Sequence, residues 1–404
     1  MTIKKVKLVH IVEGFVGGLS TYMVHVLLRL HKKGFDVTLV CSLNRKERGM
    51  AEKLNYLRDV GIRIHYVPMK RGINPIMDLY SFILLWKLLN KGSYDIVHTH
   101  CSKAGAIGRI AAFVAKVPVR LYSSHCFAYL RCNNKILKKL YYWIERLLSK
   151  VTTKYVAVSS SDMENASEAN IFPTEKCLMV ENGVPIINSI LPPDKANMIR
   201  SELMLPQNTF IITTGCRFIE YKGLKLLLEA VRYVNGDCRI VIAGEGRLEN
   251  KLKEYLLKHD LEKKVALVTP TTSMNELLQI TDLAILCSSI EAQPYFLLEA
   301  MEAKCPIIAT DVPGNRELIG TDRGLLVQPD PKAIAKAIDL LLQKKTLRMH
   351  FVDSAYDYVN HMHPIKKQIE RLTKVYSTEL KQIRSPIESK RRVDVRTDYN
   401  KKTI

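Results

Sequence analysis

Short apolar segments alternate with helical patterns along most of the chain, and they form two successive series. A break rich in Pro and Asn, over residues 183–194, separates the two series. Strands alternating with helices form parallel sheets covered on both faces, and two such halves enclose a cleft at the carboxyl ends of their strands. The predicted strands are residues 6–12, 37–41, 62–68, 96–99, 119–123, 156–159 and 177–180, then 210–215, 238–243, 265–268, 283–287, 307–310 and 324–327.

Composition and cysteine usage limit where the protein works. The 404 residues contain no apolar run near the roughly 18 residues that a membrane-spanning helix needs. The N-terminus, MTIKKVKLVHIVEGF, lacks the apolar core and cleavage site of a signal peptide. Nine cysteines without a recurring framework favour a reducing compartment. We therefore expect a cytoplasmic protein.

Positive charge is concentrated in the first half. Residues 1–190 hold 28 Lys and Arg against 13 Asp and Glu, a net +15 of the total +21. The last 24 residues hold 8 basic and 3 acidic side chains, and we expect residues 385–404 to be a disordered basic tail. Such a balance implies an anionic partner: a nucleic acid, an acidic lipid or a phosphate-bearing substrate.

The segment LAILCSSIEAQPYFLLEAMEAKCPIIATDVPGNRELI, residues 283–319, carries two carboxylates at the opening of a strand–loop–helix–strand unit. Glu291 belongs to the loop, Pro294 suits the first turn of the helix, and Glu299 lies within residues 295–303. The two carboxylates can therefore address different parts of one ligand. The adjacent helix N-terminus suits a phosphate. The alternative is that both are solvated surface groups.

Three further segments place glycines or cations at strand ends. Residues 14–18, GFVGG, open a helix and form either a plain turn or a phosphate loop, because the spacing does not match a dinucleotide fingerprint. Arg217 and Lys222 follow the first strand of the second half and suit a diphosphate. Gly244 ends the next strand in AGEGRL, which alone is a weak signal.

The run EAQPYFLLEAM followed by PIIATDVPGNRELI resembles the Glu–seven residues–Glu signature of retaining glycosyltransferases of the group 1 type, glycosyltransferase family 4. Ala292 stands where that family usually has Gly. The resemblance covers about residues 6–375 and is similar in style to bacterial polysaccharide-building enzymes. It implies Glu291, His125, Arg217 and Lys222 as catalytic residues. It implies a donor site made of Gly17, Gly18, Arg217, Lys222, Gly244, Glu291, Ala292, Gln293, Pro294 and Glu299.

The same resemblance implies a GT-B fold, an α/β architecture of two Rossmann-like doubly wound domains facing across a cleft. Residues 1–188 would hold the acceptor, residues 189–350 the nucleotide-sugar donor, and residues 351–380 would cross back onto the first domain. The implied reaction moves a sugar from a UDP-linked donor to a glycan or polyprenyl-diphosphate-linked acceptor, with retention of configuration. The nucleotide sugar is a substrate, so no cofactor is expected.

No metal is expected either. The sequence has no Asp-x-Asp and no Cys/His cluster with zinc spacing. We expect His98 and His100 to point to opposite faces of their strand and so not to share an ion. Without the resemblance, His125 could equally be a core or capping histidine.

The segment NNKILKKLYYWIERLLSK, residues 133–150, is amphipathic, with a stripe of Ile136, Leu140, Ile144 and Leu147 among basic residues. It would either pack on the sheet, which is the commoner case, or lie on an anionic membrane. The charge also allows an alternative function, an inactive protein of this fold that binds nucleic acid or an anionic membrane surface. Basic residues without aromatic stacking motifs argue against nucleic acid.

Overall fold

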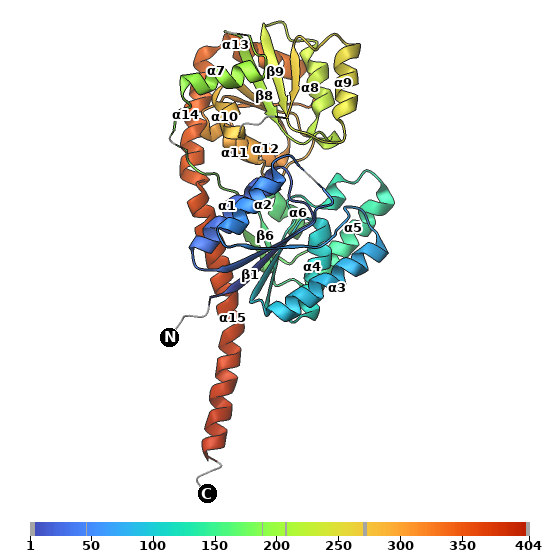
Figure 1. Cartoon of the computed structure of the whole chain (residues 1–404), viewed down its shortest axis with the longest axis vertical. Coiled ribbons are helices and arrows are strands. Elements are labelled where there is room, and N and C mark those ends of the chain that lie inside the picture. Colours follow the sequence, from blue (N-terminus) through green and yellow to red (C-terminus); the bar gives the residue numbers. More distant parts are fainter. Residues whose placement is uncertain (1–4, 46, 188, 207, 270–272, 401–404) are drawn as a thin grey trace.

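The computed structural model describes residues 5–45, 47–187, 189–206, 208–269 and 273–400, with side chains described through residue 383. The N-terminal domain is built on a seven-stranded parallel sheet in the order β3-β2-β1-β4-β5-β6-β7 (Figure 1). Its strands are β1 Lys7–Val12, β2 Asp36–Cys41, β3 Arg63–Tyr66, β4 Ile96–His100, β5 Val119–Ser123, β6 Lys154–Ala157 and β7 Cys177–Met179. Its helices are α1 Gly18–Lys32, α2 Met50–Asp59, α3 Pro75–Gly92, α4 Ser102–Val114, α5 Lys135–Leu148 and α6 Ser160–Ser167.

The C-terminal domain is built on a six-stranded parallel sheet in the order β10-β9-β8-β11-β12-β13. Its strands are β8 Phe210–Gly215, β9 Cys238–Ala243, β10 Val265–Val268, β11 Leu283–Leu286, β12 Ile307–Thr310 and β13 Leu325–Val327. Its helices are α7 Pro193–Glu202, α8 Leu224–Val231, α9 Glu249–Lys258, α10 Met274–Gln279, α11 Tyr295–Glu302, α12 Pro313–Ile319, α13 Pro331–Gln343 and α14 Lys345–Met362. The expected pair of doubly wound parallel sheets is confirmed, and each predicted strand lies within a few residues of an observed one.

Short 3₁₀ turns complete the chain at Ala128–Arg131, Ser149–Val151, Thr174–Lys176 and Glu220–Lys222. The central strands of the two sheets are buried on both faces, as parallel sheets require. The pattern at β1 illustrates this, since five of its six residues are buried. Because such strands are buried on both faces, their sequences are nearly continuous apolar runs.

The last helix, α15 (Ile365–Asn400), returns from the C-terminal domain to the N-terminal one. Its first half packs with Leu372, Tyr376 and Leu380 in the same apolar core as β1 and α1 (Figure 1). A bridge between Val184 of the interdomain segment and Pro364 fixes the point where the chain crosses. The crossing begins at α15 because α14 still belongs to the C-terminal domain, where it contacts α11 and α13.

The end of the chain differs from the expected disorder. α15 continues through residue 400, while residues 401–404 lie outside the described part. Residues 385–400 include four Lys and Arg residues, which favour helix. Extending a helix that tertiary packing has already nucleated costs much less than starting a new one. Within the described residues, no helix combines the length and apolar character that crossing a bilayer requires.

Candidate active site

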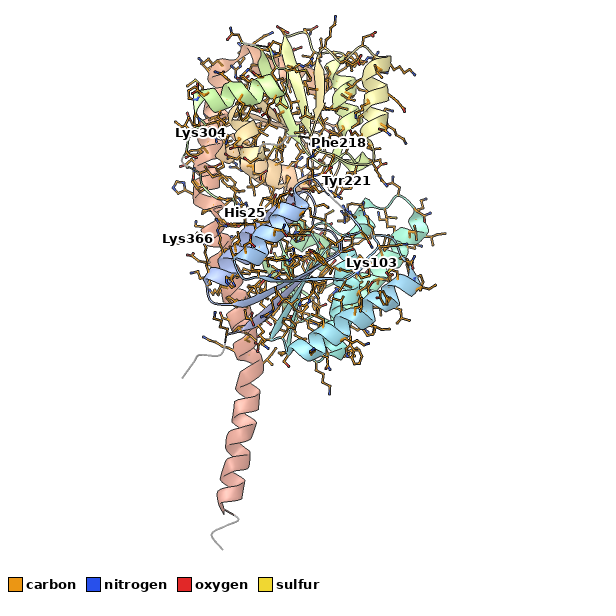
Figure 2. All side chains as sticks on the ribbon, in the orientation of Figure 1. His25, Lys103, Phe218, Tyr221, Lys304 and Lys366 are labelled. Carbon is orange, nitrogen blue, oxygen red and sulfur yellow. The ribbon has the colours of Figure 1, made fainter. Side chains whose placement is uncertain are left out.

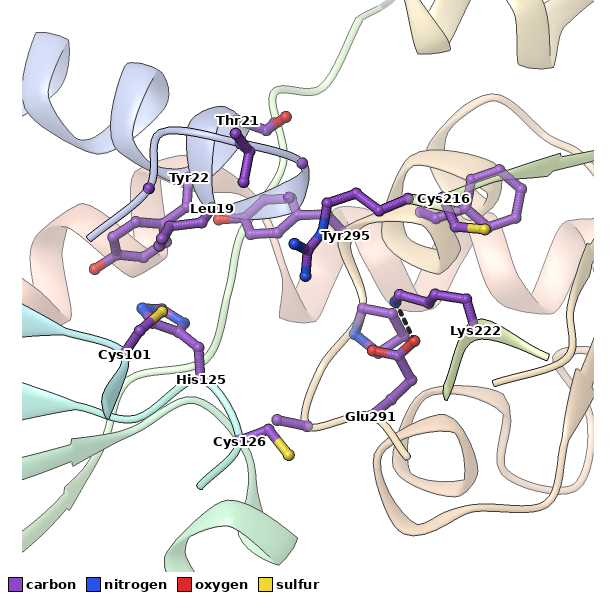
Figure 3. A pocket seen from close by; sticks show the side chains of 18 of the residues that line it. Leu19, Thr21, Tyr22, Cys101, His125, Cys126, Cys216, Lys222, Glu291 and Tyr295 are labelled. Atoms are coloured by element: carbon purple, nitrogen blue, oxygen red, sulfur yellow. Dashed lines mark hydrogen bonds and ion pairs between the residues drawn. The ribbon is translucent and has the colours of Figure 1, made fainter. Parts of the chain in front are cut away.

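A cleft of about 2010 Å³ separates the two domains and is lined by residues of both (Figure 3). The N-terminal domain contributes the loop before α1 and the segment after β5, and the C-terminal domain contributes the segments after β8, β9 and β11. These segments follow the carboxyl ends of parallel strands, where ligands of doubly wound sheets bind. All ten of the predicted donor-site residues and His125 line this cleft.

The glycine loop faces the opposite domain. Gly17 has φ +57° and precedes α1, which begins at Gly18. A Cβ at Gly17 would lie 3.3 Å from the Arg217 side chain, so the loop and this cation meet across the cleft. The backbone N–H of Gly17 donates to the Glu47 carboxylate. A carboxylate therefore sits at the helix N-terminus, the kind of position that also suits a phosphate.

Lys222 and Glu291 form an ion pair inside the cleft (Figure 3). Their side chains are 15% and 11% exposed, so solvent screens the pair only weakly. Burial by itself lowers the pKa of Lys222, but the Glu291 carboxylate and the Cys216 thiol outweigh burial, and the pKa is raised. Arg217 lies beside them, and its guanidinium donates to the Tyr221 hydroxyl at 2.8 Å. Two fixed cations and one carboxylate thus share one wall of the cleft.

The loop that carries Glu291 rests on the start of α12. A Cβ at Gly314 would lie 2.2 Å from the Ala292 carbonyl oxygen and 2.5 Å from that of Glu291. Only glycine permits this approach, which explains the use of PGN after the second strand of the motif. Gln293, which lines the cleft as predicted, also holds this loop in place. Its side-chain oxygen accepts from the Asn182 backbone N–H at 2.5 Å, so it ties the loop to the interdomain segment.

Glu299 and Gly244 lie where the motifs predicted. Glu299 follows Pro294, the residue that caps α11, by five positions and lines the cleft. Burial raises the pKa of Glu299 to about 7, partly offset by the positive charge of Lys53. Gly244 has φ +147°, and a Cβ there would lie 2.0 Å from the Cys216 carbonyl oxygen. The segment AGEGRL, a weak signal in the sequence, therefore contains a position, Gly244, where the backbone leaves no room for a side chain.

The expectation that His98 and His100 point to opposite faces is wrong. Successive side chains alternate along a strand, so residues two apart share a face. Their ring centroids are 4.3 Å apart, and both are buried. His10 joins them, because β1 pairs with β4 in a register that sets His10 beside His98. The ring nitrogens of these three histidines lie within 4.8 Å of one another.

Four arginines of the N-terminal domain that no motif had indicated also line the cleft: Arg45, Arg48, Arg71 and Arg131. Burial lowers the pKa of Arg71, Tyr221 acts in the opposite direction, and the positive charges of Arg131, Arg45 and Arg217 lower it further. Four guanidinium groups are therefore near enough to repel one another. The only sequence signal for them was the basic excess of the first half.

Comparison with known proteins identifies the family. The model for "Glycosyl transferases group 1" matches residues 196–358, and that for "Glycosyltransferase Family 4" matches residues 16–186. The chain is 30% identical to the UDP-Gal:alpha-D-GlcNAc-diphosphoundecaprenol alpha-1,3-galactosyltransferase of Escherichia coli, over 93% of this chain and 97% of that protein. It is 23% identical to the N,N'-diacetylbacillosaminyl-diphospho-undecaprenol alpha-1,3-N-acetylgalactosaminyltransferase of Campylobacter jejuni, over 81% and 89% of the two chains.

Solved structures confirm the GT-B arrangement. The Anabaena protein HepE in complex with UDP and glucose superposes with a TM-score of 0.80 at 16% identity, over 92% of this chain and all of that one. A glycosyltransferase from Rickettsia africae gives a TM-score of 0.75 at 22% identity, over 94% of this chain and all of that one. The positive charge allowed an alternative, an inactive protein that only binds. The relatives do not favour it, because they are named as sugar transferases and match most of this chain. The chain belongs to the group 1 glycosyltransferases of family 4, and it is an enzyme that transfers a sugar.

Proposed function

We propose that the enzyme transfers a sugar from a UDP-linked donor to a glycan or polyprenyl-diphosphate-linked acceptor, with retention of configuration, in bacterial surface polysaccharide or glycoconjugate synthesis. The observation that carries this proposal is the cleft wall formed by Arg217, Lys222 and Glu291 opposite the glycine loop. The names of the relatives support it. The Escherichia coli protein is named for a UDP-galactose donor and a diphosphoundecaprenol-linked acceptor, and HepE was crystallised with UDP and glucose.

The cations suit a leaving diphosphate. Arg217 can bind it through two N–H groups and Lys222 as a point charge, so both stabilise the negative charge that develops on it. Glu291, held by Lys222 in the free enzyme, would then accept hydrogen bonds from sugar hydroxyls, and Glu299 from the ribose hydroxyls.

In the proposed step the bond from the sugar C1 to the diphosphate breaks, and the acceptor oxygen bonds C1 on the same face. The acceptor proton passes to the leaving diphosphate. No metal ion or other cofactor is proposed.

The acceptor side of the cleft suits an anion. Arg45, Arg71 and Arg131 lie on the N-terminal domain and face the donor cations across the cleft, near enough for the charge of Arg217 to lower the pKa of Arg71. Arg45 is paired with Glu13 at 2.9 Å, and the Arg131 side chain donates to the Cys126 carbonyl oxygen at 2.9 Å. The Arg131 Nε is buried and lacks a partner among the described residues. An acceptor diphosphate would supply the missing negative charge and hydrogen-bond acceptors.

The reaction can be tested by product analysis. The purified enzyme is incubated with a panel of nucleotide sugars and a polyprenyl-diphosphate-linked sugar, and products are identified by mass spectrometry and by the NMR coupling of the new anomeric proton. We expect one UDP-sugar to give a product with the donor's anomeric configuration. Arg217→Ala should abolish most of this signal, whereas Arg232→Ala, on the exposed surface of the C-terminal domain, should not. A product of inverted configuration, or transfer only from non-uridine donors, contradicts the proposal.

We also propose that the N-terminal domain binds an acidic membrane surface at the cytoplasmic leaflet. Three of the four predicted stripe residues of α5 are exposed, and the fourth, Ile144, is half-buried. Ile136, Leu140, Trp143 and Leu147 are 79%, 42%, 53% and 59% exposed, whereas the buried residues of α5 are Glu145 and Leu148. At about 100° per residue the four exposed residues fall within one narrow sector of the helix. This orientation is the reverse of the commoner case expected from the sequence.

Two neighbouring helices extend this exposed surface. α4 contacts both α3 and α5, and the three helices cover one side of the N-terminal domain (Figure 1). The exposed apolar residues outside α5 are Ile76, Leu79, Tyr80 and Ile83 of α3, and Ile110, Phe113 and Val114 of α4. Lys103, near the start of α4, is labelled on this side of the molecule in Figure 2. Residues 101–150 contain 10 basic residues and 1 acidic residue.

Apolar side chains with flanking cations fit a bilayer of anionic lipid, because the apolar groups enter the headgroup boundary while the cations meet lipid phosphates. The cleft reaches this surface, since Tyr141 and Ile144 of α5 line it. A lipid-linked acceptor could therefore enter the cleft while its chain stays in the membrane. The proposed membrane surface and the proposed acceptor site are therefore adjacent on the N-terminal domain.

Flotation on vesicles separates this surface from non-specific charge. We expect binding to vesicles of acidic lipid at low salt and release at high salt. Replacing Lys135, Lys138 and Lys139 with Glu should weaken binding at least about 100-fold, since each lysine contributes about 1 kcal/mol near such a surface. The matched control replaces Lys251, Lys253 and Lys258 of α9, three exposed lysines of the other domain. Equal losses in both variants, or no binding by the wild-type protein, contradict the proposal.

A further inference from the structure

A continuous chain of hydrogen bonds runs through the interior of the N-terminal domain and ends at the cleft. Strands β1, β4 and β5 supply most of its members, and α15 supplies a tyrosine from the far end of the sequence. All are buried except His125, which is half-buried in the wall of the cleft. The members are His10, His98, His100, Ser123, His125 and Tyr376.

The direction of the chain is fixed at its inner end. The Ser123 hydroxyl donates to the backbone carbonyl oxygen of Val156 at 2.7 Å. A carbonyl can only accept, so the single hydrogen of Ser123 is used there. Nε2 of His98 lies 3.0 Å from the Ser123 oxygen and must therefore donate to it. A neutral imidazole carries one proton, so Nδ1 of His98 is an acceptor.

Each later bond follows from the one before. Nδ1 of His98 lies 2.9 Å from the Tyr376 hydroxyl, which therefore donates to it. The Tyr376 oxygen then accepts from Nε2 of His10 at 3.3 Å, which leaves Nδ1 of His10 as an acceptor. Nε2 of His100 donates to that atom at 2.9 Å. Nδ1 of His100 in turn accepts from Nε2 of His125 at 3.0 Å.

The histidines are neutral, as this assignment requires. Burial lowers the pKa of His10 to about 3. Burial and, to a smaller degree, the charge of Arg131 lower the pKa of His125 to about 4. Burial lowers the pKa of His98 and of His100 well below the usual value. At neutral pH every ring therefore has one donor and one acceptor nitrogen, and the chain has a single consistent direction.

We infer that this chain holds His125 as the tautomer protonated on Nε2, with Nδ1 left as a hydrogen-bond acceptor for a substrate hydroxyl in the cleft. Nδ1 of His125 makes no hydrogen bond to another described residue, and the residue lines the cleft. Such an atom accepts from a hydroxyl but cannot donate to a phosphate or carbonyl oxygen. Tyr376 and His10 are positioning residues, because they act on the substrate only through His100 and His125.

A metal ion does not explain the cluster as well. His10, His98 and His100 are close enough to be considered for one. Two nitrogens bound to one tetrahedral zinc ion would lie about 3.3 Å apart, and both lone pairs would point at the ion. Nε2 of His100 and Nδ1 of His10 instead lie 2.9 Å apart, the first as donor and the second as acceptor. The remaining nitrogens of His98 are occupied by Tyr376 and Ser123.

NMR spectroscopy of protein labelled with ¹⁵N in its histidine rings tests the tautomers directly. Signals are assigned with His125→Gln and His100→Gln variants. We expect the wild-type His125 signal to show protonated Nε2 and unprotonated Nδ1 at neutral pH. A His125 ring protonated on Nδ1, or on both nitrogens, overturns the inference. So does a stoichiometric metal in the purified protein whose removal changes these signals.

Tyr376→Phe tests the role of α15, since it removes the one hydroxyl that joins His98 to His10. We expect the His10, His100 and His125 signals to become mixtures of tautomers, and kcat to fall about fivefold with little change in the donor KM. Tyr129→Phe is the matched control, because the Tyr129 hydroxyl bonds the Asn165 carbonyl oxygen and contacts none of the chain. Unchanged His125 signals in Tyr376→Phe overturn the inference. The kinetic part rests on the proposed function, whereas the tautomer holds or fails independently of which sugar is transferred.

Discussion

The two domains are both doubly wound parallel sheets, yet they carry their chemistry in different ways. In the C-terminal domain the donor residues sit on tightly constrained backbone, where a Cβ on Gly223, Gly244 or Gly314 would lie 1.9 to 2.2 Å from a carbonyl oxygen. In the N-terminal domain the distinctive features are side chains: arginines in the cleft, a buried histidine chain, and apolar residues exposed on α3, α4 and α5. Charge follows the same division, with +15 on residues 1–190 and +6 on the rest.

This contrast has a physical reading. A nucleotide diphosphate is the same in every turnover, so a rigid backbone cradle with two fixed cations can be preorganised for it. An acceptor attached to a membrane requires a surface that meets lipid, and surfaces are set by exposed side chains. If this reading is right, changes in the donor half should show a rigid backbone and a dependence on fixed charges.

The largest effect is expected where the donor backbone is tightest. Gly223 follows Lys222, has φ +67°, and a Cβ there would lie 1.9 Å from the Cys287 carbonyl oxygen. Gly223→Ala should therefore lower the free energy of unfolding by at least about 3 kcal/mol, through steric overlap as well as backbone strain. Gly34→Ala in the N-terminal domain is the control, because Gly34 has φ +92° but nothing within 4 Å. It should cost only about 1 kcal/mol, and equal losses in denaturant titrations would remove the contrast in rigidity.

The second largest effect is expected from removing the Glu291 carboxylate in the cleft. Glu291→Gln keeps the shape of the side chain but removes the charge that pairs with Lys222. Turnover should fall at least about tenfold, a loss of roughly 1.4 kcal/mol in transition-state stabilisation, with the fold intact by circular dichroism. Glu249→Gln, which removes a half-exposed carboxylate on α9 that pairs with Lys253, is the control. Wild-type turnover in Glu291→Gln would place this residue outside the active site.

A third prediction concerns pH. Burial raises the pKa of Glu299 to about 7 in the free enzyme. Hydrogen bonds from ribose hydroxyls to the carboxylate would lower this pKa, so donor binding releases a proton. Affinity is then highest above pH 7 and falls as the pH drops through 7, by up to about tenfold per unit. Donor KM or calorimetric affinity measured from pH 8 to pH 6 should show this slope in the wild-type enzyme and lose it in Glu299→Gln. A slope that persists in the variant assigns the proton to another group.

The smallest expected effect is that of a chelator. If Arg217 and Lys222 neutralise the diphosphate, EDTA should change turnover by less than about twofold, since a Mg²⁺ bridge is then not needed for the leaving group. The assay should be repeated after adding Mg²⁺ and Mn²⁺. Abolition by EDTA with rescue by either ion would mean that the donor half relies on a metal and that two cationic side chains are insufficient.

Much of the donor half was predictable from the sequence because its signals are local. Glu291, Glu299, Arg217 and Lys222 each stand at a fixed distance from a strand end or helix start, and all line the cleft. Strand ends of a parallel sheet meet at one edge, so correct strands bring such residues together. The bond between Gln293 and Asn182 was not predictable, since it depends on where the interdomain segment passes.

Much of the N-terminal half was not predictable. The error at His98 and His100 was one of strand geometry, but His10 could join them only through the pairing of β1 with β4. The exposed side of α5 depends on which face the neighbouring helices cover, and an amphipathic pattern fits either orientation. Arg71 and Arg131 had no motif, because an arginine in a basic region carries no signal of its own.

The sequence by itself determined the two series of strands and helices, the class of fold, and the donor motif, because periodicity, turn residues and residue spacing are properties of neighbouring positions. Only the tertiary structure decided that Gly17 meets Arg217, that Tyr376 reaches His10 and His98 from the end of the chain, and that α5 exposes its apolar face. These contacts join residues far apart in the chain. They depend on strand order and on the path of α15, which local patterns do not encode.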